Sequence, residues 1–144
     1  MNQASLPIST VQEIRDQCLC LATQRAARLL ARRFDRLFAP LGLTNGQFSM
    51  LVALSGRWKP RLGELADFLA MDSTTVTAAV KTLEKRGLMP DETDARVRRP
   101  ALTDAGRVLV AQAVPLWRAE HALVNAEMAP QDPAALAQIL RQLG

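Results

Sequence analysis

Short hydroxylated and cationic side chains gather between residues 73 and 85. Val76, Val80 and Leu83 recur there at i, i+4 and i+7, the spacing of a helix with one apolar face. Short side chains allow close approach, hydroxyls reach base edges or phosphates, and lysines neutralise phosphates, so the opposite face suits a DNA major groove. An ordinary solvated helix carries similar residues, and the following segment favours the DNA contact. The candidate contacts are Ser73, Thr74, Thr75, Thr77, Lys81 and Lys85.

Three arginines follow this helix within four residues. Gly87 is placed to end the helix, because the positive φ of a helix terminus is least costly for glycine. The polar stretch beyond it predicts a hairpin, and arginines on such a hairpin reach an adjacent, narrow minor groove. We therefore expect Arg96, Arg98 and Arg99 to contact DNA, and Asp94 to support the hairpin by holding Arg96 in a charge-assisted pair.

The elements before this helix must position it. Leu62, Leu65 and Leu69 mark a preceding helix that packs by one face. The period then breaks, and Asp72 or Ser73 begins the next helix by accepting a hydrogen bond from its free amides. Helix, turn, helix and basic hairpin, in this order, predict a winged helix-turn-helix.

On these residues the chain resembles the MarR family of bacterial transcriptional regulators. The residues that carry the resemblance are 62–88, the pair Asp94 and Arg96, Leu102 with Thr103, and Gly106. Thr44 with Gln47 resembles the opening of the family's second helix, and Asp132 its C-terminal end, so the resemblance covers nearly the whole chain. Two departures stand out: the stretch between Leu88 and Asp94 is short, and Ala78 and Thr82 stand where relatives often carry arginine.

The resemblance implies a mainly α fold with a small β-wing, in one compact domain of three parts. Residues 1–43 are expected to form an N-terminal dimerisation helix, residues 44–107 the winged helix-turn-helix DNA-binding region, and residues 108–144 the C-terminal dimerisation helices. The net charge is only +4, so one copy has few phosphate partners. A two-fold homodimer on a pseudo-palindromic operator doubles those contacts.

The terminal segments predict long helices with apolar faces. Thr10 to Glu13 fits a capping box, and no glycine or proline interrupts residues 11–39, so one continuous helix is expected there. Pro115 should kink or interrupt the helix that begins at Thr103, and Pro130 should stop it. A last helix is expected over residues 134–143. These faces have little to pack on within one small domain, so we expect them to intertwine with a second copy.

Cys18 and Cys20 raise the question of redox chemistry. On a helix, two residues at this spacing lie about 200° apart, so they cannot bridge each other without unwinding it. With a single histidine in the chain, they also make a poor zinc site, and no metal is expected. A buried, inert pair of small hydrophobic side chains is one interpretation.

The other interpretation is a peroxide sensor. The segment 17–47 resembles the first helix of the organic-hydroperoxide-sensing branch of MarR regulators, and Cys20 falls on the reactive cysteine of that branch. That branch uses tyrosines to polarise its thiolate, whereas this chain has none and carries Gln24 and Phe34 at those positions. Arg25 or an arginine of a partner chain is a possible substitute, and both interpretations stay open.

Two further groups of residues are candidates for binding. Trp117 and His121 are one helical turn apart and either line a ligand cleft between the dimerisation helices and the winged region, or are ordinary packed or surface residues. Arg57, Lys59 and Arg61 lie in a loop and are placed to touch the phosphate backbone.

The composition points away from enzymes and membrane proteins. The chain has no glycine-rich phosphate loop and only one histidine, so neither catalysis nor a cofactor is expected. The uncharged, mostly apolar run of residues 108–117 is far shorter than the roughly 20 residues that span a bilayer, and no signal peptide is evident. We expect a cytoplasmic protein.

The sequence thus predicts a dimeric DNA-binding regulator, a repressor released from its operator by a small aromatic or lipophilic ligand or by oxidation of Cys20. The alternative is a protein-interaction module, in which the wing and the exposed helix bind another protein without sequence-specific DNA binding.

Overall fold

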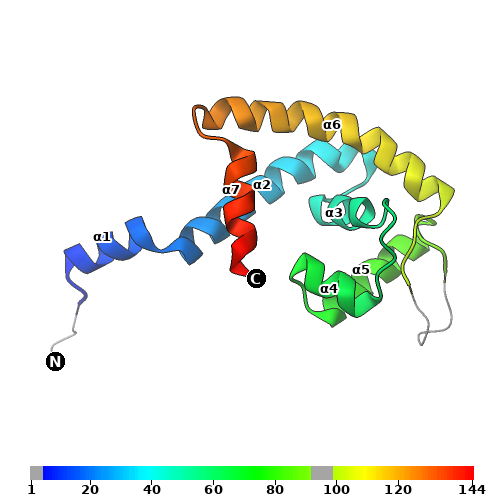
Figure 1. The fold of residues 1–144 in the computed structure, drawn as a ribbon, viewed down its shortest axis with the longest axis horizontal. Helices are drawn as coiled ribbons and strands as arrows, with labels where there is room; N and C mark the ends of the chain where they lie inside the picture. The colour runs from blue at the N-terminus through cyan, green and yellow to red at the C-terminus, as the bar shows by residue number, and fades with distance from the viewer. Residues whose placement is uncertain (1–4, 92–98) are drawn as a thin grey trace.

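The computed structural model describes residues 5–91 and 99–144 of the chain (Figure 1). Within these residues every regular element is helical and no strand is present. The mainly α fold is therefore confirmed, whereas the β-wing is not, and most of the predicted hairpin lies outside the described residues. In chain order the elements are α1 (Ile8–Gln17), α2 (Leu19–Phe38), η1 (Ala39–Leu41), α3 (Asn45–Ala53), α4 (Leu62–Leu69), α5 (Ser73–Lys85), α6 (Asp104–Met128), α7 (Pro133–Leu140) and η2 (Arg141–Leu143).

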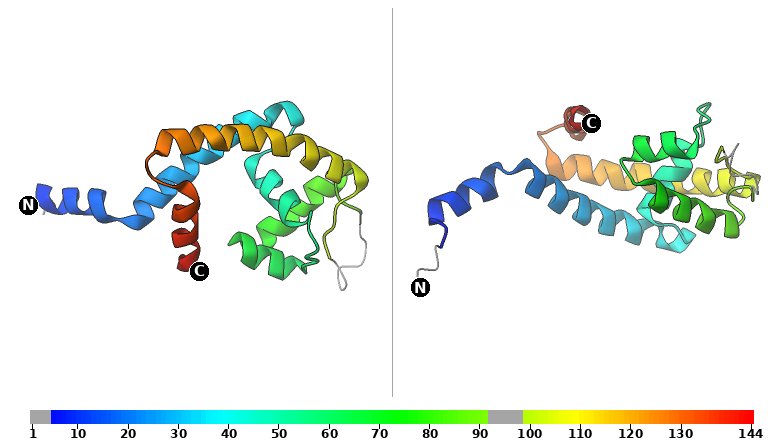
Figure 2. Two further views of the ribbon diagram at one scale, coloured as in Figure 1. Left: turned by 45° about the horizontal axis from the view of Figure 1, so that its top comes forward. Right: turned by 90° about the horizontal axis from the view of Figure 1, so that it is seen from below.

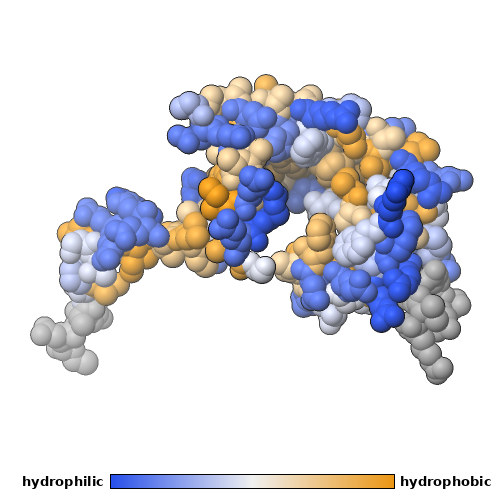
Figure 3. All heavy atoms as spheres, in the orientation of Figure 1, coloured by the Kyte–Doolittle hydropathy of each residue, from blue (hydrophilic) through white to orange (hydrophobic). Residues whose placement is uncertain are grey.

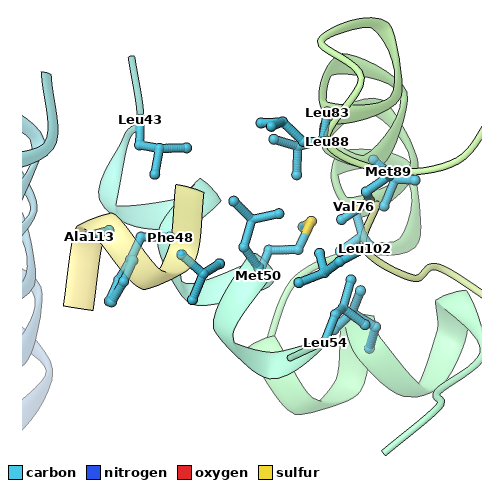
Figure 4. Close-up of a cluster of buried hydrophobic side chains, with 14 of the residues drawn as sticks. Leu43, Phe48, Met50, Leu54, Val76, Leu83, Leu88, Met89, Leu102 and Ala113 are labelled. Carbon is cyan, nitrogen blue, oxygen red and sulfur yellow. The ribbon is translucent and has the colours of Figure 1, made fainter. Parts of the chain in front are cut away.

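One apolar core lies between α3, α4, α5 and the first turns of α6 (Figure 4). The stripes predicted from the sequence point into it, since Leu65 of α4 and Val76, Val80 and Leu83 of α5 are at most 1% exposed. Phe38 at the end of α2 stacks on Phe48 of α3 with ring centroids 4.5 Å apart. The rest of the core is Leu43, Met50, Leu51, Leu54, Ala66, Leu88, Met89, Leu102, Val110 and Ala113.

The helix boundaries of this region follow from local capping. Thr44 and Gln47 form a reciprocal capping box at the start of α3. Asp72 caps α5, and Thr103 caps α6 by accepting a hydrogen bond from the amide of Gly106 at 3.1 Å. Gly87 has a φ of +72°, which confirms its predicted role after the last turn of α5.

The prediction of one continuous helix over residues 11–39 is wrong. The backbone leaves the helical region at Cys18, where ψ is 102°, and the Cys18 thiol caps α2 by accepting a hydrogen bond from the amide of Leu21. The predicted capping box at Thr10 is also absent, because α1 already begins at Ile8, directly after Pro7. Lack of glycine and proline permits a continuous helix but does not impose one. Nothing in the described chain packs on α1 to hold it in line with α2.

Of the C-terminal helices, α6 packs along α2 and α7 packs against α6. Helix α6 is not interrupted at Pro115 but bends along its length, and it ends at Met128, before Pro130 (Figure 1). It lies beside α2, whereas α1 extends away from the body of the molecule (Figure 2). Helix α7 follows, slightly shorter than predicted because its last turn is a 3-10 helix. In the described parts of the chain, no helix is long and apolar enough to cross a membrane.

Candidate nucleic-acid interface

Helix α5 presents the predicted face to solvent. Its buried stripe fixes the rotation of the helix, so that Ser73, Thr74, Lys81 and Lys85 are exposed and Thr77 is half-buried. All of these except Lys85 line one shallow hollow of about 370 Å³, together with Ala78. A wide, shallow face of short side chains with lysine beyond them permits close approach to base edges and phosphates.

The first turn of α5 is held by Asp72 and Thr75. The Asp72 carboxylate accepts hydrogen bonds from the Thr75 hydroxyl at 2.7 Å and from the Thr75 amide at 2.9 Å. Both hydrogen bonds lower the pKa of Asp72 below its ordinary value, and the bond from the hydroxyl has the larger effect. The hydroxyl proton of Thr75 is thus used inside the helix, whereas the exposed hydroxyls of Ser73 and Thr74 donate no such bond to the described residues.

The chain that enters the predicted hairpin and the chain that leaves it meet between the end of α5 and the start of α6. Thr103 donates its amide to the carbonyl of Leu88 at 3.1 Å and its hydroxyl to the carbonyl of Gly87 at 2.6 Å. Gly106 lies so close that an added Cβ would sit 2.3 Å from the same Leu88 oxygen. Asp94, Arg96 and Arg98 lie outside the described residues.

Arg99 is exposed, and its guanidinium donates to the backbone carbonyl of Lys59 in the segment between α3 and α4. No sequence pattern indicates this contact, because the two residues are 40 positions apart and both lie outside regular elements.

Trp117 and His121 lie against each other, with ring centroids 4.8 Å apart. Both line a cleft of about 260 Å³ between α2, α3 and α6, the place expected for a ligand. The remaining lining is mostly apolar, with the polar groups of Asn45 and Ser49 at one side: Ala27, Leu30, Ala31, Phe34, Phe38, Asn45, Phe48 and Ser49. Binding of a ligand in this cleft stays a prediction.

Polar contacts that were not predicted from the sequence hold the walls of this cleft. Asp35 accepts hydrogen bonds from the Asn45 amide at 2.7 Å and from its side chain at 2.8 Å, which lower the pKa of Asp35 and join α2 to α3. Arg33 of α2 forms ion pairs with Glu120 and Glu127 of α6. The only available signal was the spacing of the two glutamates, which are seven residues apart and so share a helix face.

The two cysteines are free thiols, with Cys18 half-buried and Cys20 exposed. In the single chain the two thiols are therefore not the buried pair of that interpretation, because the helix breaks at Cys18 and α2 turns Cys20 outward. The sulfur has a donor although the chain has no tyrosine. Gln24 donates its side-chain amide to the Cys20 sulfur at 3.0 Å and accepts from Arg28 at 3.4 Å.

Comparisons with known proteins all match transcriptional regulators. A family model described as the MarR family matches residues 43–99. The uncharacterised HTH-type transcriptional regulator YybA of Bacillus subtilis is 30% identical over 103 residues, which cover 67% of this chain and 66%, just under two thirds, of that relative.

Solved structures match over more of the chain. The transcriptional regulator MosR of M. tuberculosis is 37% identical, with a TM-score of 0.75 over 90% of this chain and 94% of that one. A second structure shows MosR in complex with DNA, and it matches with a TM-score of 0.74 at the same 37% identity, over 88% of this chain and 93% of that one.

Proposed function

The chain belongs to the MarR family of transcriptional regulators, which are not enzymes, and we propose that it binds a pseudo-palindromic duplex as a homodimer and represses transcription there. The observation that carries the proposal is the exposed face of α5, with Ser73, Thr74 and Thr77 beside Lys81. A similar protein, MosR, has been solved in complex with DNA, which supports DNA as the partner. Lys81 and Lys85 contact phosphates in this arrangement, and the hydroxyls reach base edges.

The termini supply the reason for a dimer. Among the described residues, neither α1 nor α7 contains a buried side chain, although both carry large apolar ones. Covering these surfaces with a second copy removes apolar area from water and brings in a second α5. Two readers related by a two-fold axis bind half-sites about one helical turn, or a multiple of it, apart. The large exposed apolar residues of α1 and α7 are Ile8, Val11, Ile14, Leu136 and Ile139, and η2 adds Leu143.

Release from the operator depends on the cleft beside Trp117. A small aromatic ligand fits the aromatic lining, and Asn45 and His121 provide polar groups that orient it. The walls of the cleft come from α2, α6 and α3. Helices α2 and α6 lead to the proposed dimer contacts, and α3 packs in the same core as α5. Ligand binding therefore changes the spacing between the two copies of α5.

Oxidation of Cys20 is a second release mechanism, favoured by the hydrogen bond from Gln24. The sulfur of an exposed thiol can attack the peroxide bond of a hydroperoxide. This reaction converts the thiol to a sulfenic acid, and the hydroperoxide is reduced to an alcohol. Cys20 lies near the start of α2, next to the break at Cys18, so a change there alters the direction of the α1 arm.

The experiment that tests the proposal is selection of duplexes from a randomised pool by the full-length protein. The proposal expects two copies of one half-site in inverted orientation, with centres about 10 base pairs or a multiple of that apart. If no duplex sequence is enriched, and the affinity for duplex does not depend on salt concentration, the protein-interaction module would be favoured instead.

A further inference from the structure

A second group of cations lies outside α5, in the segment between α3 and α4. Arg57, Lys59 and Arg61 alternate along residues 57–61, and all three are exposed. None of them forms an ion pair with an acid in the described part of the chain, and Glu64, three residues after Arg61, does not pair with them either. Their charge is therefore available to an external anion.

The backbone of this segment is fixed at several points. At its start, the Ser55 hydroxyl donates to the Leu51 carbonyl at 2.7 Å, and at its end the Leu65 amide donates to the Arg61 carbonyl at 3.0 Å. Between them, Pro60 is buried, and Trp58 packs edge-on against Phe68 of α4, with ring centroids 5.1 Å apart. A fixed backbone presents the cations in one arrangement and reduces the entropy that binding costs.

The segment also lies against the base of the predicted wing. The guanidinium of Arg99 donates to the carbonyl of Lys59, which joins the chain entering α6 to the segment between α3 and α4. The views in Figure 2 show these two segments side by side. In Figure 3, strongly hydrophilic atoms gather along the segment between α3 and α4.

We propose that Arg57, Lys59 and Arg61 form a phosphate-binding ridge that holds the DNA backbone beyond the part of the groove that α5 enters. This inference rests on the proposed function. Because one N–H group of Arg99 is already committed to the Lys59 carbonyl, Arg99 is a positioning residue that sets the ridge against the wing base. Contacts to phosphate carry no sequence information, so the ridge adds affinity and register rather than specificity.

The first test compares the salt dependence of duplex binding for the parent and for the triple variant Arg57→Ala, Lys59→Ala, Arg61→Ala. The slope of log affinity against log salt concentration should fall by about 0.9 for each phosphate that is no longer neutralised, with three such phosphates per copy. Affinity should decrease equally on specific and random duplexes, so that the ratio of the two affinities is unchanged. The matched control is Arg25→Ala, Arg32→Ala, Arg36→Ala, which removes the same charge from the exposed face of α2 and should keep the parent slope.

A parent slope in the triple variant would overturn the ridge and leave the proposed function intact. A parent that binds duplexes without salt dependence would instead contradict the proposed function itself. These two failures are distinct, since the second is visible in the parent alone.

The second test assigns the role of Arg99 by a double-mutant cycle. Arg99→Ala should lower the slope in the parent but leave it unchanged in the triple variant, because no ridge remains to be positioned. Arg99→Lys, which keeps one donor, should restore most of the parent slope. An equal decrease in both backgrounds would show that Arg99 contacts phosphate directly and would overturn the positioning role.

Discussion

Arg33 of α2 holds Glu127 of α6 by two parallel hydrogen bonds, from Nη1 to Oε2 at 2.7 Å and from Nη2 to Oε1 at 2.8 Å. The same guanidinium also contacts Glu120, which lies earlier on the same face of α6. Arg33 directly precedes Phe34, which lines the cleft. The ion pairs thus join α2 to α6 directly beside this cleft.

This contact predicts a stability that depends on pH. Hydrogen bonds from Arg33 lower the pKa of Glu127, so the pair stabilises the fold above the ordinary pKa of 4.5, and that stability is lost as the pH falls through the lower, folded-state pKa. Glu127→Gln should therefore destabilise the protein at neutral pH and lose its effect in acid. Urea unfolding at both pH values measures this, with Glu13→Gln, on the exposed α1, as the control. An equal effect of Glu127→Gln at both pH values would exclude the charge as the cause.

Gly106 predicts a steric effect at the base of the wing. In Gly106→Ala the new methyl group would meet the Leu88 carbonyl oxygen, which is itself bonded to Thr103, so the backbone must move. We expect the free energy of unfolding to fall by about 1–3 kcal/mol, as for overpacked cores. Gly63→Ala in α4 is the matched control, because its methyl group meets nothing within 4 Å, and it should be neutral or stabilising by up to about 1 kcal/mol. Equal destabilisation of both variants would contradict the close approach at Gly106.

The apolar face of α1 predicts a variant that separates dimerisation from folding. Ile14→Glu places a charge on a side chain that is 50% exposed in the single chain and covered in the proposed dimer. Sedimentation should show monomers, with helix content retained and duplex affinity reduced at least tenfold. Val52→Glu, at a side chain of α3 that is 42% exposed and lies outside the expected dimerisation segments, should remain dimeric. Dimers of both variants with the parent's association constant would place the interface elsewhere.

The contact between Gln24 and Cys20 predicts how oxidation depends on a single amide. If the amide polarises the sulfur, Gln24→Leu should slow the reaction of Cys20 with cumene hydroperoxide several-fold, as followed by mass spectrometry. Cys20→Ser protein should stay on its duplex after treatment, whereas Cys18→Ser protein should still be released. Release of the Cys20→Ser variant as readily as the parent would remove the redox mechanism and leave the ligand cleft.

Local sequence patterns made the position and orientation of α5 predictable. The stripe of Val76, Val80 and Leu83, the cap at Asp72 and the positive φ at Gly87 depend on neighbours within a few residues, and all three are present. The outward face of α5 followed directly from that stripe.

Contacts between distant residues were not predictable in the same way. Arg33 and Glu127 are 94 positions apart, and their meeting depends on how α2 packs against α6. The break at Cys18 was missed for a different reason. No proline or glycine marks it, and the continuity of the helix there depends on packing that the single chain does not provide.

The central claim is that α5 binds duplex DNA through Lys81, and the salt dependence of binding tests it most directly. Fluorescence anisotropy with the parent should show affinity falling steeply with salt, and Lys81→Ala should lower the slope by about 0.9 for each copy in the dimer. Arg32→Ala, on the exposed face of α2, should keep the parent slope. A shallow slope for the parent, unchanged in Lys81→Ala, would contradict the account.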